Sequence, residues 1–123
     1  MTDSIVLFGH GSRDPLWHRP IEAVAERIRA TAPAVRVACA YLELSAPDLP
    51  TTVDRLVAEG ARAIRIVPMF LGVGKHARED LPLLVEGLRR AHPGVAIGLT
   101  PAVGEHPLLI DAIAHIATAG TEA

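Results

Sequence analysis

Three side chains that can bind a metal or accept a proton come shortly after apolar stretches of the sequence. They are His10, Glu43 and His76. Imidazole and carboxylate groups are ligands for Fe, Co, Ni and Zn, and they also act as general bases near neutral pH. The three residue types therefore predict either a site for a divalent metal or a site for proton transfer, provided that the fold brings them together.

The apolar stretches are typical of β-strands, and a helical pattern follows each of them. The four stretches cover residues 5–8, 35–42, 63–67 and 95–99. Strands that alternate with helices predict an α/β fold in which the strands form one parallel sheet. We therefore expect a four-stranded parallel sheet with helices on both faces, of the flavodoxin-like type, as a single domain over residues 1–123.

Proline, glycine and capping residues indicate where the helices begin. We expect helix starts at Asp14–Pro15, at a capping box that opens with Ser45, near residues 76–80 and at Pro107. Pro82 is compatible with the third helix only if it lies in the first turn, because proline lacks the N–H group that the helix interior needs.

The carboxyl ends of parallel strands meet at one edge of the sheet, where ligand-binding loops gather. We therefore expect His10, Glu43 and His76 at that edge. Each also has an ordinary interpretation: the glycines around His10 can serve only a tight turn, Glu43 can be a surface carboxylate, and His76 can face water at a helix start. Convergence of three loops favours a functional site. The fourth loop adds Glu105 and His106, and His106 is a candidate supporting residue.

Basic and hydroxyl side chains near the same edge predict binding of carboxylates or phosphates. They are Ser12, Arg13, Lys75 and Arg78. The sequence contains neither the phosphate-binding motif of P-loop NTPases nor the glycine fingerprint of dinucleotide-binding domains. An NTPase is therefore not expected, and a dinucleotide-binding site has little support.

The composition narrows the classes of function further. The 123 residues include 12 Lys and Arg against 14 Asp and Glu, and the formal net charge of −2 argues against a nucleic-acid partner. No apolar run approaches the roughly 20 residues of a membrane helix, and the first residues lack the basic region of a secretory signal. We expect a cytoplasmic protein that binds neither nucleic acid nor membranes.

Five segments of the sequence resemble the short form of the class II chelatases, which act on sirohydrochlorin. The segments are Gly9–Arg13, Tyr41–Glu43, Pro68–Leu71, Gly74–Pro82 and Gly104–Leu108. The resemblance covers nearly the whole chain and implies ATP-independent insertion of a divalent metal into sirohydrochlorin during cobalamin or sirohaem biosynthesis. Co²⁺ is the first candidate, with Fe²⁺ and Ni²⁺ as alternatives, and the metal is a substrate rather than a permanent cofactor.

The resemblance also implies a site and an assembly. It places the two histidines of the family on His10 and His76 and its acidic residue on Glu43, as catalytic and metal-binding residues. We assign the basic and hydroxyl set named above to the peripheral carboxylates of the tetrapyrrole. Longer relatives hold two such repeats in one chain and this chain holds one, so we expect a chelatase half-domain that forms a homodimer around the cleft.

Two other functions need similar residues. A metal or tetrapyrrole carrier uses the same ligands without turnover, and stoichiometric binding without insertion would favour it. Histidine phosphatases also carry a nucleophilic histidine after the first strand, but an arginine directly precedes it, where this chain has Gly9. Phosphatase activity that disappears with His10 would favour that alternative.

Overall fold

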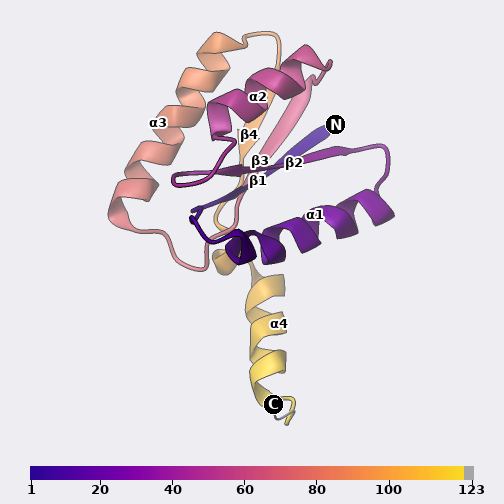
Figure 1. Ribbon diagram of the computed structural model, residues 1–123, viewed down its shortest axis with the longest axis vertical. Coiled ribbons are helices and arrows are strands. Elements are labelled where there is room, and N and C mark those ends of the chain that lie inside the picture. The colour runs from indigo at the N-terminus through magenta and orange to yellow at the C-terminus, as the bar shows by residue number, and fades with distance from the viewer. Residues whose placement is uncertain (121–123) are drawn as a thin grey trace.

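Four parallel strands form one sheet, and helices lie against both of its faces (Figure 1). The computed structural model describes residues 1–120. The strands are β1 (Ser4–Gly9), β2 (Arg36–Tyr41), β3 (Ala63–Pro68) and β4 (Ala96–Leu99). The helices are α1 (Arg19–Thr31), α2 (Leu49–Ala58), α3 (Lys75–Ala91) and α4 (Pro107–Thr118), with the short 3₁₀ helices η1 (Pro15–His18) and η2 (Val103–Glu105).

The strand order β2-β1-β3-β4, with every neighbouring pair parallel, confirms the predicted α/β sheet. The chain runs outward from β1 to β2 and then returns past β1 to β3. The loops after β1 and β3 therefore lead to helices on opposite faces of the sheet, α1 on one face and α3 on the other. Sheets of this kind bind ligands in the crevice between two such loops.

A hydrophobic core fills each face of the sheet. The larger core lies against α2 and α3, and its fully buried members include Phe8, Val53, Leu56, Ile66 and Val85. The smaller core lies against α1 and contains Leu7, Ile21, Ala25 and Tyr41. Successive residues of a strand point to opposite faces, so β1 contributes to both cores and is held from both sides.

Helix α4 departs from the expected pattern because it does not cover the sheet. It projects away from the sheet (Figure 1), and none of its residues is buried. Its large apolar side chains are exposed, by 75% for Leu108, 52% for Ile110, 42% for Ile113 and 75% for Ile116. Among residues 1–120, no helix is long and apolar enough to cross a membrane.

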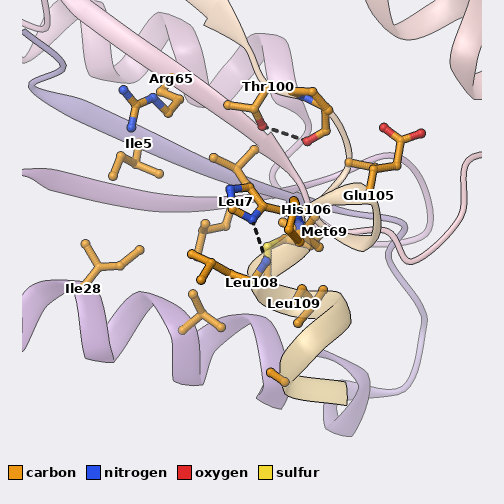
Figure 2. A pocket seen from close by; sticks show the side chains of 17 residues that line it. Ile5, Leu7, Ile28, Arg65, Met69, Thr100, Glu105, His106, Leu108 and Leu109 are labelled. Carbon is orange, nitrogen blue, oxygen red and sulfur yellow. Dashed lines mark hydrogen bonds between the residues drawn. The ribbon is translucent and has the colours of Figure 1, made fainter. Parts of the chain in front are cut away.

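A groove remains open beside α4, over the face of the sheet that α1 covers only in part. Its volume is about 820 Å³, and apolar side chains from β1, β3, α1 and the first turns of α4 form most of its lining. Figure 2 shows Ile5 and Leu7 on β1, Ile28 on α1 and Leu109 on α4 around this groove. Arg65 of β3 is the only lysine or arginine in the lining.

Two of the expected helix starts are confirmed, at Asp14–Pro15 and at Pro107. Asp14 accepts a hydrogen bond from the N–H of Leu16 at 3.0 Å, but the helix that it caps is the short η1, and α1 follows it. Helix α4 begins at Pro107, as expected.

Two other helix starts differ from the sequence prediction. The residue that caps α2 is Asp48 rather than Ser45, because the Asp48 carboxylate accepts the N–H of Thr51 at 2.8 Å. Helix α3 begins at Lys75, so Pro82 lies in its interior and not in its first turn. Pro82 is exposed, and at an exposed position water can hydrate the carbonyl group that lacks its N–H partner.

Asp3 joins β1 to β3 at the amino edge of the sheet. Its carboxylate accepts hydrogen bonds from the N–H groups of Arg62 at 2.8 Å and Ala63 at 3.1 Å, and from the Ser4 hydroxyl at 2.9 Å. Desolvation works to raise the pKa of Asp3, but these hydrogen bonds and the nearby charge of Arg36 outweigh it and lower the pKa below its ordinary value.

Replacing Asp3 by Ala is expected to lower the free energy of unfolding by about 1–2 kcal/mol at neutral pH, because the variant loses hydrogen bonds to a charged group. A carboxylate with a lowered pKa stabilises the folded state above its unfolded-state pKa of about 4, and the stabilisation disappears as the pH falls through the folded-state pKa.

Urea unfolding at neutral pH and at acid pH measures both effects. Glu26→Ala is the control, because it removes only an exposed ion pair with Arg29. A difference between the Asp3→Ala variant and the parent that stays the same at both pH values would contradict the assignment.

Candidate active site

The structure places the three predicted groups at the carboxyl edge of the sheet. His10 directly follows the last residue of β1, and Glu43 lies two residues beyond β2. His76 is the second residue of α3 rather than part of the preceding loop. All three side chains are exposed. The loop that carries His10 and the loop that leads to His76 follow the neighbouring strands β1 and β3, the position at which sheets of this kind bind ligands.

Backbone contact at Gly11 holds the loops of His10 and Glu43 together. The N–H of Glu43 donates to the carbonyl oxygen of His10 at 3.0 Å. Gly11 has a φ of +90°, and a Cβ atom at this position would lie 1.9 Å from the carbonyl oxygen of Glu43. Only glycine fits this conformation and this space, so the motif around His10 is required for the close approach of the two loops.

The imidazole of His10 is oriented by an aromatic ring from the loop after β3. His10 stacks on Phe70 with ring centroids 4.1 Å apart and an interplanar angle of 29°. Phe70 is 2% exposed and belongs to the larger core. One face of the imidazole thus lies against the core, while the side chain stays exposed.

A second glycine contact fixes the loops after β3 and β4. The N–H of Gly104 donates to the carbonyl oxygen of Phe70 at 2.9 Å. A Cβ atom on Gly104 would lie 1.9 Å from the carbonyl oxygen of Leu71. The loop that positions the ring under His10 is therefore held in turn by the segment that precedes α4.

A side-chain hydrogen-bond network supports the His10 loop from the other side. The Ser45 hydroxyl donates to the carbonyl oxygen of Ser12 at 2.6 Å and accepts the N–H of Ser12 at 3.0 Å. His18 Nε2 lies 2.9 Å from the same hydroxyl, and its ring stacks on Tyr41 with centroids 4.4 Å apart. The sequence interpretation of Ser45 as a helix cap was therefore wrong.

The ring beneath His18 is an uncharged phenol. Tyr41 is buried at the end of β2, and this burial, together with Cys39 and Glu22, raises the pKa of Tyr41 to about 12. No local signal in the sequence indicates that His18 would stack there, because the contact depends on the η1 turn lying against the end of β2.

A cavity of about 410 Å³ opens beside His10 on the α1 face. Its wall is mostly apolar and includes Leu16, Trp17, Tyr41 and Met69. Trp17 is 62% exposed, although tryptophan is the largest apolar side chain in the protein. The site thus combines exposed polar groups with an apolar wall, as small-molecule sites commonly do.

The predicted anion-binding residues lie around the same edge. Arg13, Lys75 and Arg78 are exposed, and within residues 1–120 none of the three forms an ion pair. The Ser12 hydroxyl accepts the N–H of Asp14 at 3.1 Å. Gly74 gives α3 no side-chain cap, which leaves the amino end of the helix available to an anion.

His106, the supporting residue expected from the sequence, already uses one of its ring nitrogens. His106 Nδ1 accepts the N–H of Leu108 at 3.0 Å, so His106 acts as the cap of α4 (Figure 2). In the part of the chain that the structure describes, no three His, Cys, Asp or Glu side chains lie close enough together to hold a metal ion. His10, Glu43 and His76 therefore do not form a closed three-ligand site within this chain.

Curated relatives of the sequence are sirohydrochlorin chelatases. Over 83 residues the chain is 37% identical to the sirohydrochlorin cobaltochelatase of Methanococcus aeolicus, and the match covers 68% of this chain and 58% of the relative. Over 115 residues it is 28% identical to the sirohydrochlorin ferrochelatase of Bacillus subtilis, with 94% of this chain and 44% of the relative covered. The chain thus spans about half the length of these relatives.

Solved structures give the same result for the fold. The CbiX protein from Marinobacter aquaeolei superposes with a TM-score of 0.81 at 36% identity, over 94% of both chains. The sirohydrochlorin chelatase SirB from Bacillus subtilis, solved with cobalt, superposes with a TM-score of 0.79 at 27% identity, over 98% of this chain and 51% of SirB. The CbiX family profile matches residues 4–118. The chain therefore belongs to the CbiX family, in agreement with its resemblance to the short class II chelatases.

Proposed function

We propose that this protein inserts a divalent metal into sirohydrochlorin without ATP, with Co²⁺ as the first candidate and Fe²⁺ or Ni²⁺ as alternatives. The observation that carries the proposal is the position of His10 directly after β1 and of His76 in the first turn of α3, the helix that follows the neighbouring strand β3, in a CbiX-family fold. Relatives named cobaltochelatase and ferrochelatase support the substrate class. A cytoplasmic location stays a prediction of the sequence.

The reaction requires groups that bind a metal weakly and also accept protons. One M²⁺ ion enters the macrocycle and two pyrrole N–H protons leave, so the charges balance. An imidazole can replace water on the ion and can then take up a proton, and the carboxylate of Glu43, on the neighbouring loop, can do the same. An exposed and incomplete set of ligands suits this task, because a closed site would retain the metal.

The substrate also carries carboxylates around its ring. Arg13, Lys75 and Arg78 present charges that are not used in ion pairs among residues 1–120, and Ser12 adds a hydroxyl group on the same loop as His10. We assign these four residues to the peripheral carboxylates of the tetrapyrrole. The apolar wall beside His10 offers a surface against which the face of a macrocycle can pack.

We further propose that two copies of the chain pair to complete the cleft. Helix α4 exposes an apolar stripe, and the 820 Å³ groove beside it leaves part of the sheet uncovered. In a two-fold dimer each chain can place α4 in the groove of its partner, because one self-complementary surface is then used twice. The groove is lined by one basic residue, Arg65, and one acidic residue, Glu105, and an ion pair between Arg65 and the Asp111 carboxylate of a second copy is compatible with the pairing.

Length supports the same pairing. The chain covers 51% of SirB, so two copies together approach the length of that single-chain chelatase.

Replacing His10 or His76 by Ala is expected to lower the rate of metal insertion by about 10²-fold or more, because each variant loses a group that binds the metal and accepts a proton. The assay follows the absorbance of metal-free sirohydrochlorin with catalytic amounts of protein and Co²⁺, Fe²⁺ or Ni²⁺ under anaerobic conditions. His92→Ala is the control, since His92 lies at the far end of α3. Near-parental rates in the His10 and His76 variants would overturn the assignment.

The same assay separates the alternatives. Multiple turnovers with one metal support a chelatase, whereas spectral changes that stop at one equivalent of protein support a carrier.

Replacing Ile113 by Asp is expected to convert a dimer of twice 13.0 kDa into a monomer, because a charge would be buried in an apolar contact. Sedimentation equilibrium at several protein concentrations measures the mass. Leu83→Asp is the control, since Leu83 is an exposed apolar residue on α3, away from the groove. A parent protein that stays monomeric, or an Ile113 variant that stays dimeric, would contradict the proposed pairing.

A further inference from the structure

The hydroxyl group of Ser45 lies at the centre of three polar contacts that join distant parts of the chain. It is 2.6 Å from the carbonyl oxygen of Ser12, 3.0 Å from the amide nitrogen of Ser12 and 2.9 Å from Nε2 of His18. Ser12 and Ser45 are 33 residues apart, and His18 and Ser45 are 27 apart. The contacts therefore connect the loop after β1, the end of η1 and the loop after β2.

The number of protons decides the direction of each hydrogen bond. A serine hydroxyl has one proton and two lone pairs. Its proton must lie between Ser45 and the carbonyl oxygen of Ser12, because two oxygens at 2.6 Å need a shared proton. The N–H of Ser12 occupies one lone pair, so His18 occupies the other as a donor. His18 therefore carries a proton on Nε2.

This network adds a second tie between the two loops that carry predicted catalytic groups. Ser12 is two residues from His10, and Ser45 is two residues from Glu43. Backbone hydrogen bonds from Leu42 to Gly9 and from Glu43 to His10 already join these loops next to the sheet, where Glu43 also contacts Gly11. The Ser45 network adds contacts farther along both loops, beyond those backbone hydrogen bonds, and so restricts how the two segments move relative to each other.

Contacts with β2 and η1 hold the residues of this hydrogen-bond network in place. The ring of His18 stacks on Tyr41, which is buried at the end of β2. The Ser12 hydroxyl accepts the N–H of Asp14, and Asp14 caps η1, whose last residue is His18. His18 and Ser45 are only partly buried, and His18 contacts the smaller core through the ring of Tyr41.

We propose that His18 and Ser45 are positioning residues that hold His10 and Glu43 in the arrangement needed for metal transfer. This inference rests on the proposed chelatase function. A misplacement of reacting groups by about 1 Å can cost roughly 10²-fold in rate, so loss of the tie affects the transfer step. Of the residues assigned to the tetrapyrrole, only Ser12 takes part in the tie, through its backbone N–H and carbonyl groups and not through its hydroxyl, so the affinity for the tetrapyrrole depends less on the tie than the rate does.

The test compares four variants with the parent protein. Ser45→Ala removes the hydroxyl group, and Ser45→Thr restores it. His18→Phe keeps an aromatic ring over Tyr41 but removes the Nε2 donor. The double variant Ser45→Ala with His18→Phe shows whether the two residues act through one another.

Three readouts separate positioning from a loss of folding. The first is kcat and KM for sirohydrochlorin, measured well below the unfolding temperature of each variant. The second is the affinity for Co²⁺ alone, from the visible absorption of the bound ion. The third is the affinity for sirohydrochlorin, from quenching of Trp17, the only tryptophan in the chain, which lines the cavity beside His10.

We expect Ser45→Ala and His18→Phe each to lower kcat by roughly 10-fold to 100-fold, with KM and the quenching affinity within about twofold of the parent. Ser45→Thr is expected to recover most of the rate. The double variant should lose no more than the worse single variant, because both substitutions break the same tie. Parental kcat in His18→Phe, or multiplied losses in the double variant, would overturn the proposal.

The readouts also separate this proposal from the chelatase function. If the parent binds Co²⁺ but never inserts it, the chelatase function fails, and weaker Co²⁺ binding in both single variants would still support positioning of His10. If all variants insert metal at the parental rate, the positioning role fails and the chelatase function stands. Nitrogen-15 NMR of the parent gives a further check, since a proton on Nδ1 of neutral His18 with none on Nε2 would contradict the hydrogen-bond directions.

Discussion

The carbonyl oxygen of Glu43 occupies the space that a side chain at residue 11 would need, and the rest of the site depends on this contact. It is possible because the β1–β2 pairing continues beyond the strands, where Leu42 donates to Gly9 at 2.9 Å and Glu43 donates to His10 at 3.0 Å. Backbone hydrogen bonds rather than side-chain contacts therefore determine where His10 and Glu43 lie relative to the end of the sheet. Side chains then adjust orientation, through the Phe70 ring under His10 and the Ser45 hydroxyl behind Ser12.

The position of Phe70 couples the site to the interior. Its ring belongs to the core that α2 and α3 form with the sheet, and the same ring forms the surface on which His10 stacks. Gly104 holds the backbone of Phe70 from the opposite side. A substitution in the larger core can therefore change the orientation of the imidazole without touching the crevice, because well-packed interiors transmit small displacements.

Periodicity and capping predicted the parts of the structure that depend on nearby residues. The four strands, their parallel order and the helix start at Pro107 are of this kind, since apolar runs and proline act within a few residues of the chain. The cap of α2 was misassigned because Ser45 and Asp48 are both good capping residues. Asp48 bonds to Thr51 within its own turn, while Ser45 bonds to Ser12, and only the folded chain shows that partner.

Contacts over long sequence separations explain what the sequence could not reveal about the site. Glycines around a histidine predicted a sharp turn, but the atom that requires Gly11 comes from the loop after β2. His18 has no neighbour in the sequence that distinguishes it from an exposed histidine, and its partners Tyr41 and Ser45 lie on another loop. Spacing identified which groups could react, and the tertiary contacts determine which residues orient them.

Helix α4 is apolar, and the chain does not bury it within its own fold. Its burial by another unit therefore depends on the concentration of that unit. Two units joined by a short linker meet each other at an effective concentration on the order of millimolar, however dilute the protein is. Under the pairing proposed above, the covering of α4 by a second copy depends instead on how much of the protein the cell contains. Under the pairing proposed above, the amount of completed cleft would rise with the square of the monomer concentration when the protein is scarce, so that expression level itself would regulate activity.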